Sequence, residues 1–227
     1  MRPVNKAQVP LDENGQAIVF KKYSRARRYL IDRIGEYCSY CERRIVVNLA
    51  IEHVKPKSIN ESLKLKWSNF LLACPNCNST KGAKEINLDD YVWPDIDNTY
   101  PLFAYDESGV VKVSNELEDD EMIERVKNSI KLVGLDKLPP KEGSIAWEEA
   151  SDRRFEHRVQ AWKDAEEGAR IYLAVSPENQ RESLEYIKTI VIHQGFWSIW
   201  MRAFEGIPEV QQILIDTFPG TRAECFR

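Results

Sequence analysis

The chain has 227 residues, of which 43% are hydrophobic and 30% charged, and its formal net charge is −4. This length and composition are typical of a soluble globular protein, either one large domain or a small domain with an extension. The sequence contains no window of 18 consecutive apolar residues and no apolar signal-peptide core, so we expect no membrane span and a cytoplasmic location. It also lacks a Gly-x-x-x-x-Gly-Lys phosphate loop, which excludes ATP hydrolysis by that route.

Charge is divided unevenly along the chain. Residues 1–85 contain 16 Lys/Arg and 8 Asp/Glu, a net charge of +8, whereas residues 86–227 have a net charge of −12. The positive charge of residues 1–85 is suited to binding the phosphate backbone of a nucleic acid. The acidic back half is either a solvated helical surface or a face that binds another protein.

Residues 1–20 carry few structural signals and are expected to form an extended or partly flexible lead. A helix is predicted over residues 21–34, ended by Gly35, and its apolar positions form one stripe: Tyr23, Ala26, Leu30 and Ile34. The other faces carry six Lys or Arg side chains against one acid. Such a surface is either a solvated charged face or one that follows phosphates, with Arg25 and Arg28 as candidate nucleic-acid contacts.

Two Cys-x-x-Cys pairs, Cys38/Cys41 and Cys74/Cys77, are separated by 32 residues. Each pair offers two sulfurs from one tight turn to a tetrahedral ion, and in the cytoplasm such cysteines are metal ligands more often than disulfides. The sequence therefore predicts a structural zinc site. Cys225 is expected to be a packed thiol without chemical use.

The segment between the cysteine pairs predicts two strands. Residues 45–54 are rich in β-branched side chains and suit a strand or hairpin that carries Glu52 and His53. A Lys-Pro-Lys break opens a polar loop, after which residues 67–73 form a short apolar strand. A short helix is expected from about Asn78. The predicted order is Cys-x-x-Cys turn, strand, loop, strand, Cys-x-x-Cys turn and helix.

The residue types in this segment suit phosphodiester hydrolysis. The oxygen donors of Glu52 and Asn78 are appropriate for a hard cation such as Mg²⁺ or Mn²⁺. An imidazole beside that ion, His53, is able to deprotonate a water held near a phosphodiester. Zinc would then organise the fold, and a second ion would serve catalysis.

The acidic half predicts one small hairpin and then helices. The hairpin is expected around residues 101–113, and a clear amphipathic helix over 118–134 ends at a glycine. One long helix is predicted from Ile145 to Leu173. Further helices are expected from Ser176 to Gly195, with Pro177 at the first position, and from Pro208 to just before Pro219. An apolar turn is expected between the tryptophans at 197 and 200.

Residues 38–84 resemble HNH nucleases of the ββα-metal type, in the zinc-stabilised subgroup. The resemblance implies that His53 is the general base, that Glu52 and Asn78 bind the catalytic metal, and that Asn69 braces the loop bearing the base. It further implies that the structural zinc has four ligands: Cys38, Cys41, Cys74 and Cys77. One departure is Glu52, where the family usually has Asp, because the extra methylene moves the carboxylate.

Three lysines near this motif are candidate nucleic-acid contacts. Lys81 matches the lysine of the family's Cys-Asn-x-x-Lys ending and is expected to touch phosphate, with a solvated helix lysine as the alternative. Lys55 and Lys57 belong to the loop after the base. A zinc module that binds nucleic acid without cutting it is the non-enzymatic alternative, although such a module has no need of the Glu-His, Asn and Asn set.

A second resemblance extends over the whole chain, to the HNH effectors of Septu-type and retron-linked anti-phage systems. It is carried by short motifs such as Ile-Glu-His-Val-x-Pro-Lys-Ser and, at 218–226, Phe-Pro-Gly-Thr-x-x-x-Cys-Phe. The resemblance implies a partner ATPase of the ABC or overcoming-lysogenisation-defect type. The expected docking surfaces are residues 1–20 and the helical region 115–227. A stand-alone restriction-like or toxin nuclease is the enzymatic alternative.

These observations predict an α+β protein: a zinc-stabilised ββα-metal core followed by a mainly α-helical C-terminal region. The predicted divisions are a lead and basic helix over 1–36, the nuclease core over 37–85, and a hairpin with acidic helices over 86–227. The expected activity is metal-dependent hydrolysis of nucleic acid, with DNA as the target, in anti-phage defence.

Overall fold

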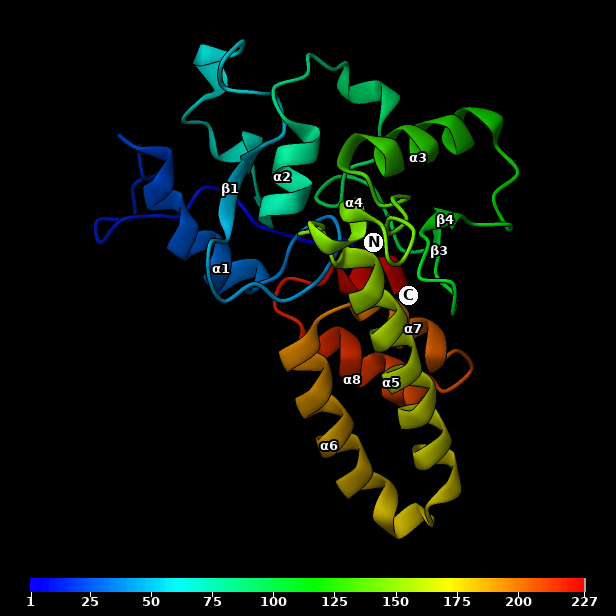
Figure 1. Cartoon of the computed structure of the whole chain (residues 1–227). Helices are drawn as coiled ribbons and strands as arrows, with labels where there is room; N and C mark the ends of the chain where they lie inside the picture. Colours follow the sequence, from blue (N-terminus) through cyan, green and yellow to red (C-terminus); the bar gives the residue numbers. More distant parts are fainter. Residues whose placement is uncertain (227) are drawn as a thin grey trace.

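A two-stranded antiparallel sheet lies between the two cysteine pairs, in a computed structural model that describes residues 1–226. Strand β1 (Ala50–His53) pairs with β2 (Phe70–Ala73), and His53 lies opposite Phe70. Helix α2 (Pro75–Lys81) follows β2 and lies against the sheet, as Figure 1 shows. Strand, strand and helix form one ββα unit, which confirms the predicted α+β class.

The first strand is shorter than predicted. Val46 and Val47 are exposed, and Asn48 has a positive φ of 59°, which bends the chain before β1 begins. The loop after β1 includes the 3-10 turn η2 (Glu61–Leu63), and η3 (Trp67–Asn69) leads directly into β2. The β-branched run over 45–49 is therefore a surface loop.

The basic helix forms in two parts. A 3-10 turn, η1 (Tyr23–Ala26), continues into α1 (Arg27–Ile34), which ends at Gly35 as predicted. Ala26, Leu30 and Ile34 are buried, and α1 packs against β2. Tyr23 packs against the same core but is only half-buried, and its ring also meets His53 at the end of β1.

The first residues of the chain are packed against the core, which favours the extended lead over the partly flexible one, the two alternatives that the sequence left open. Met1, Val4 and Lys6 are buried, and the Lys6 ammonium donates to the Phe70 carbonyl at 2.9 Å and pairs with Asp95 at 2.6 Å. Residues 11–17 form an exposed turn. Most of the exposed residues within 1–20 belong to this turn.

Residues 86–135 cover the other side of α2. They contain η4 (Leu88–Asp90), a small hairpin of β3 (Phe103–Ala104) and β4 (Lys112–Val113), and helix α3 (Asp120–Val133). Asp119 caps α3 by accepting from the Met122 amide at 3.1 Å, and α3 packs on α2. This segment therefore shares the core of the ββα unit.

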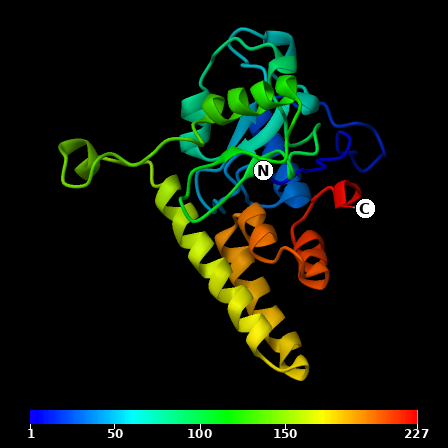
Figure 2. The ribbon, with the colours of Figure 1, turned by 90° about the vertical axis from the view of Figure 1, so that its right-hand side faces the viewer.

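The C-terminal region is helical, as predicted. Its helices are α4 (Ile145–Glu148), α5 (Arg154–Ala174), α6 (Pro177–Gln194), α7 (Trp197–Ala203) and α8 (Pro208–Thr217), followed by the turn η5 (Ala223–Phe226). Helices α5 and α6 form a hairpin that projects away from the sheet (Figure 1), and α4 lies on an arm extending to one side (Figure 2). Across residues 1–226, no helix is both long and apolar enough to span a membrane.

The single long helix predicted over 145–173 is wrong, because the chain breaks between α4 and α5. At the break, the Asp152 carboxylate accepts hydrogen bonds from the backbone amide and the side chain of Arg154. Polar side chains of this kind compete with helical hydrogen bonding and favour helix starts. The segment between Trp197 and Trp200, expected to be an apolar turn, instead lies in helix α7 (Trp197–Ala203).

Two hydrophobic cores are present in the described chain. One gathers residues from 1 to 135 around the sheet, and the other gathers residues from α5 to α8 together with Tyr37. The predicted boundary at residue 85 does not coincide with this division, since α3 belongs to the first core.

Polar contacts join the two cores at the first cysteine turn. Glu42 accepts hydrogen bonds from the Ser198 amide (2.7 Å) and hydroxyl (2.6 Å) and from the Arg2 amide (2.6 Å). Its carbonyl accepts from the Phe196 amide at 3.1 Å, and the Arg44 amide donates to the Gln194 carbonyl at 3.2 Å. The chain just after Cys41 is thereby fixed to the end of α6.

Replacing Gly195 with alanine is expected to destabilise this junction by about 2–4 kcal/mol. Gly195 has a φ of +81°, and a Cβ there would lie 2.4 Å from the Glu42 carbonyl oxygen and 2.7 Å from the Arg44 nitrogen. Gly206 is the matched control, because it has the same φ but no other atom within 4 Å of the place that a Cβ would take. Urea denaturation of both variants measures the difference; an equal cost would contradict the close approach.

Candidate active site

The four cysteines predicted to bind zinc come together. Their sulfurs lie within 4.8 Å of one another, all four are buried, and the Cys41 and Cys74 sulfurs are 3.7 Å apart. Zinc–sulfur bonds of about 2.3 Å place tetrahedral sulfurs about 3.8 Å apart, whereas a disulfide needs about 2.05 Å. The donor set therefore fits a tetrahedral zinc ion.

Local backbone structure positions these sulfurs. The Glu42 amide donates to the Cys38 carbonyl at 2.9 Å, which closes the first turn. Cys74 is the N-cap of α2, and its sulfur accepts from the Cys77 amide at 3.4 Å. The first turn and the start of α2 thus face each other across the cluster.

His53 occupies the last position of β1 and faces a pocket separate from the cysteine cluster. Its Nε2 lies 3.0 Å from the Lys64 carbonyl oxygen, so Nε2 donates and Nδ1 is left as the basic nitrogen. The imidazole also packs edge-on against Phe70, with ring centroids 5.3 Å apart. The ring is held from two sides, in a defined tautomer.

Burial lowers the pKa of His53, and the nearby charges of Lys57 and Lys81 lower it further. The hydrogen bond to Lys64 opposes this effect without cancelling it. The imidazole is therefore neutral over a wider pH range than an ordinary histidine, as a general base requires.

Asn69 bridges the loop that follows His53. Its Oδ1 accepts from the Lys55 amide at 2.7 Å, and its Nδ2 donates to the Lys55 carbonyl at 2.9 Å and the Leu63 carbonyl at 3.3 Å. One amide side chain thereby fixes both ends of the loop that also presents the Lys64 carbonyl to His53. This is the location from which Asn69 is able to brace the base.

Lys81 is buried, which corrects its predicted contact with phosphate. Its ammonium lies 2.8 Å from Glu52 Oε1 and donates to the His53 carbonyl at 2.9 Å, and 1% of its side chain is exposed. It joins the end of α2 to β1. Burial raises the pKa of Glu52, and Lys81 is the main group that opposes the rise.

A pocket of about 280 Å³ brings together His53, the predicted base, and Glu52 and Asn78, the predicted ligands of the catalytic metal. Lys57 lies on its wall, together with two residues that the sequence reasoning did not select for the site, Tyr23 and Arg27. Their spacing of four residues, which places two helical side chains on one face, was the available signal.

The other predicted nucleic-acid contacts lie outside the pocket wall. Arg25 is exposed, and Arg28 is exposed and pairs with Asp32 at 2.9 Å on the same helix. Lys55 is half-buried, with its backbone held by Asn69. These side chains belong to the surrounding basic surface and not to the site itself.

Tyr23 and Lys57 pack on the open side of His53. The Tyr23 ring meets the imidazole edge-on at 5.0 Å between centroids, and the Lys57 ammonium lies 3.9 Å from the centre of the Tyr23 ring. A cation over an aromatic face is a stabilising arrangement. It keeps a positive charge at the mouth of the pocket.

Comparison with known proteins agrees with this geometry. Residues 38–84 match the family model described as HNH endonuclease. The chain is also similar to the Septu protein PtuB of Bacillus thuringiensis, with 28% identity over 99 residues. That alignment covers 41% of this chain and 38% of the length of PtuB. Residues 38–84 therefore form an HNH endonuclease domain.

Proposed function

We propose that this protein is a metal-dependent endonuclease that hydrolyses phosphodiester bonds, with DNA as its target. The observation that carries the proposal is the pocket lined by Glu52, His53 and Asn78, with the imidazole tautomer fixed by the Lys64 carbonyl. The match of residues 38–84 to the HNH endonuclease family supports it.

In this proposal His53 is the general base. Nε2 stays bonded to the Lys64 carbonyl, and Nδ1 takes a proton from a water that attacks the phosphorus. Asn69 holds the loop that carries the Lys64 carbonyl, so it acts through the position of His53. Lys57, Arg27 and the basic surface around them attract the phosphate backbone.

Glu52 and Asn78 are the proposed ligands of a catalytic Mg²⁺ or Mn²⁺. Carboxylate and amide oxygens suit these hard cations, and both side chains line the pocket beside His53. When bound, such an ion stabilises negative charge on the scissile phosphate and the leaving oxygen. Lys81 holds Oε1 of Glu52, which leaves the second carboxylate oxygen as the proposed ligand.

The biological role that we propose is anti-phage defence together with an ATPase of the ABC or overcoming-lysogenisation-defect type, in the cytoplasm. The similarity to the Septu protein PtuB supports a defence role. Exposed apolar side chains on the arm around α4, including Ile145 and Trp147, are proposed as part of the surface that the ATPase contacts.

Plasmid cleavage with Mg²⁺, with Mn²⁺ and with a chelator tests this proposal, each in the presence and absence of an ATPase encoded beside the gene. We expect nicking or linearisation that requires the divalent ion. DNA binding by the zinc-loaded protein without cleavage under all these conditions would instead favour a zinc-dependent nucleic-acid adapter.

The pH dependence of the base is a separate expectation. Because the pKa of His53 is lowered, activity should fall only as the pH drops below the ordinary histidine value of 6.5. Lys57→Met removes a positive charge that lowers this pKa, so the midpoint should move upward. Lys66→Met, an exposed lysine of the same loop region, is the control. NMR titration of the imidazole measures the midpoint directly; identical midpoints in all three proteins would contradict the electrostatic account.

A further inference from the structure

Two arginines at the start of α5 are buried, although arginine is normally a surface residue. Arg154 and Arg158 lie one helical turn apart and are 1% and 2% exposed. Arg154 Nη1 lies 3.0 Å from the sulfur of Cys77 and donates to the Val133 carbonyl at 2.7 Å. Arg158 donates to the carbonyls of Gly109 (2.6 Å) and Leu135 (3.0 Å).

These hydrogen bonds do not balance the buried charge. Two like charges one turn apart repel each other, and a buried charge is costly unless an opposite charge is near. Asp152 supplies one negative charge, 2.7 Å from Arg154 Nη2. Nη1 of Arg158 is buried and has no hydrogen-bond partner within residues 1–226.

A third arginine, Arg43, lies near the cysteine cluster. The side chain of Arg43 is partly buried and donates to Asn76 Oδ1 at 2.6 Å, between Cys74 and Cys77 in the sequence. Arg43 is two residues from Cys41 in the sequence, and Arg158 lies one helical turn from Arg154, whose Nη1 is 3.0 Å from the Cys77 sulfur. Taken together, these three arginines and Asp152 have a net charge of +2.

The complex of one divalent cation with four thiolates has a net charge of −2. This charge is equal and opposite to that of the three arginines and Asp152. We propose that Arg43, Arg154 and Arg158 are the counter-charges of the metal–thiolate cluster, so that metal binding holds the start of α5 against the nuclease domain. The proposal rests on the zinc assignment and is independent of whether the pocket at His53 cleaves nucleic acid.

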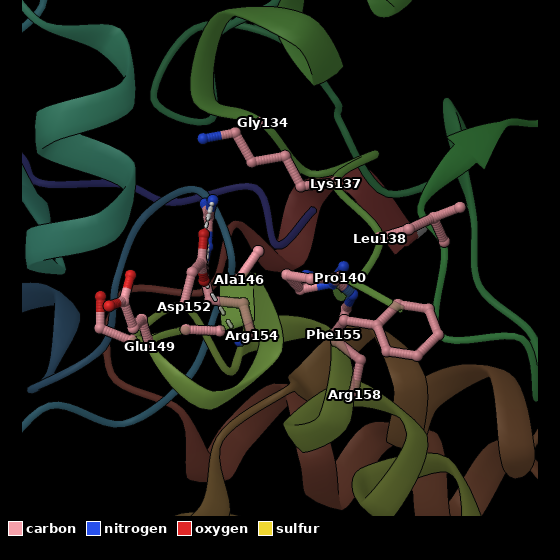
Figure 3. A pocket seen from close by; sticks show the side chains of 12 residues that line it. Gly134, Lys137, Leu138, Pro140, Ala146, Glu149, Asp152, Arg154, Phe155 and Arg158 are labelled. Carbon is pink, nitrogen blue, oxygen red and sulfur yellow. Dashed lines mark hydrogen bonds and ion pairs between the residues drawn. The ribbon is translucent and has the colours of Figure 1, made fainter. Parts of the chain in front are cut away.

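Polar contacts hold much of the junction between the start of α5 and the nuclease domain, because apolar packing there is incomplete. Figure 3 shows Asp152, Arg154 and Arg158 grouped where the chain enters α5, below the loop that carries Lys137 and Leu138. A pocket of about 350 Å³ lies between them. Apolar contact between the arm and α5 is thus incomplete, and Arg154 reaches through to Cys77 while Arg158 is held by the Gly109 and Leu135 carbonyls.

A purely structural role is the competing explanation, in which Arg154 only caps the Val133 carbonyl at the end of α3. That role predicts a loss of stability but no change at the metal. Hydrogen bonds to metal-bound thiolates stabilise the negative sulfur and typically change metal affinity by about 10–100-fold. Metal-centred measurements therefore separate the two explanations.

The test compares Arg154→Met with Arg154→Lys and with Arg153→Met in the full-length protein. Arg153 is the matched control, because it is the preceding residue, is exposed and pairs with Glu156. Zinc release to a competing chelator should be at least about tenfold faster in Arg154→Met, partly restored in Arg154→Lys and unchanged in Arg153→Met. Equal release from all four proteins, wild type included, would overturn the proposal.

Two further measurements keep the test informative if Arg154→Met folds poorly. When the protein is loaded with Co²⁺, the sulfur-to-metal charge-transfer band reports on the thiolates. Relative to the wild type, this band should shift in Arg154→Lys but not in Arg153→Met. In unmodified protein, chelating the zinc should raise hydrogen exchange in the first turns of α5 more than in α8. Unchanged spectra together with unchanged exchange at α5 would overturn the proposal.

Discussion

Replacing His53 with alanine should lower the rate of phosphodiester cleavage by about 10²–10⁴-fold. The imidazole is the proposed base, its Nε2 is bound to the Lys64 carbonyl, and burial together with the nearby lysine charges lowers its pKa. Alanine removes the proton acceptor and leaves Glu52 and Asn78 in place. The measurement is single-turnover cleavage of a labelled duplex, with enzyme in excess.

The matched control for this prediction is His157→Ala. His157 is exposed on α5 and lies outside the pocket of His53, so its loss should leave the rate unchanged. Zinc content and duplex binding by the His53 variant should equal those of the wild type. Cleavage that survives the His53 substitution, with both controls normal, would remove His53 from the mechanism.

Replacing Cys74 with serine should unfold the nuclease domain. Structural zinc contributes about 10–16 kcal/mol of apparent binding free energy in small domains, whereas a whole domain is stable by about 5–15 kcal/mol. Serine still provides an oxygen that accepts from the Cys77 amide, so the N-cap of α2 is retained. The expected loss is therefore due to the metal and not to the helix cap.

Cys225→Ser is the control for this substitution, since Cys225 is half-buried and lies outside the four-sulfur cluster. Zinc content measured by atomic absorption and helix content measured by circular dichroism should be normal in that variant. The Cys74 variant should have less than one zinc per chain and reduced helix content. A fully folded Cys74 variant without zinc would show that core packing alone maintains the domain.

Local sequence signals predicted the parts of the site that depend on spacing. The two Cys-x-x-Cys pairs gave the four buried sulfurs, and the Glu-His step before a Lys-Pro break gave the end of β1. Glycine and proline marked the ends of α1, α6 and α8 for reasons of backbone geometry. These features depend on a few neighbouring residues, and such residues are visible in one sequence.

Long-range partners were not predictable in this way. Lys81 looked like a surface lysine of a short helix, and only the packing of α2 on β1 shows that it is buried beside Glu52. Arg154 lies in a run of mixed charge, and its contact with Cys77 spans 77 residues of sequence. The helical periodicity of the sequence also continued across 149–153, where the chain breaks after α4 and Asp152 accepts from the Arg154 amide at the start of α5.

The shape of the α5–α6 hairpin has a mechanical consequence. Helix α5 has 21 residues, which corresponds to a length of about 31 Å. It is attached to the nuclease domain at its first turns, and its far end at Ala174 projects away from the sheet. A rotation of about 10° at the attached end would move the far end by about 5 Å. The hairpin is therefore a lever, and a force applied at its tip acts with greatest leverage on the contacts beside Cys77.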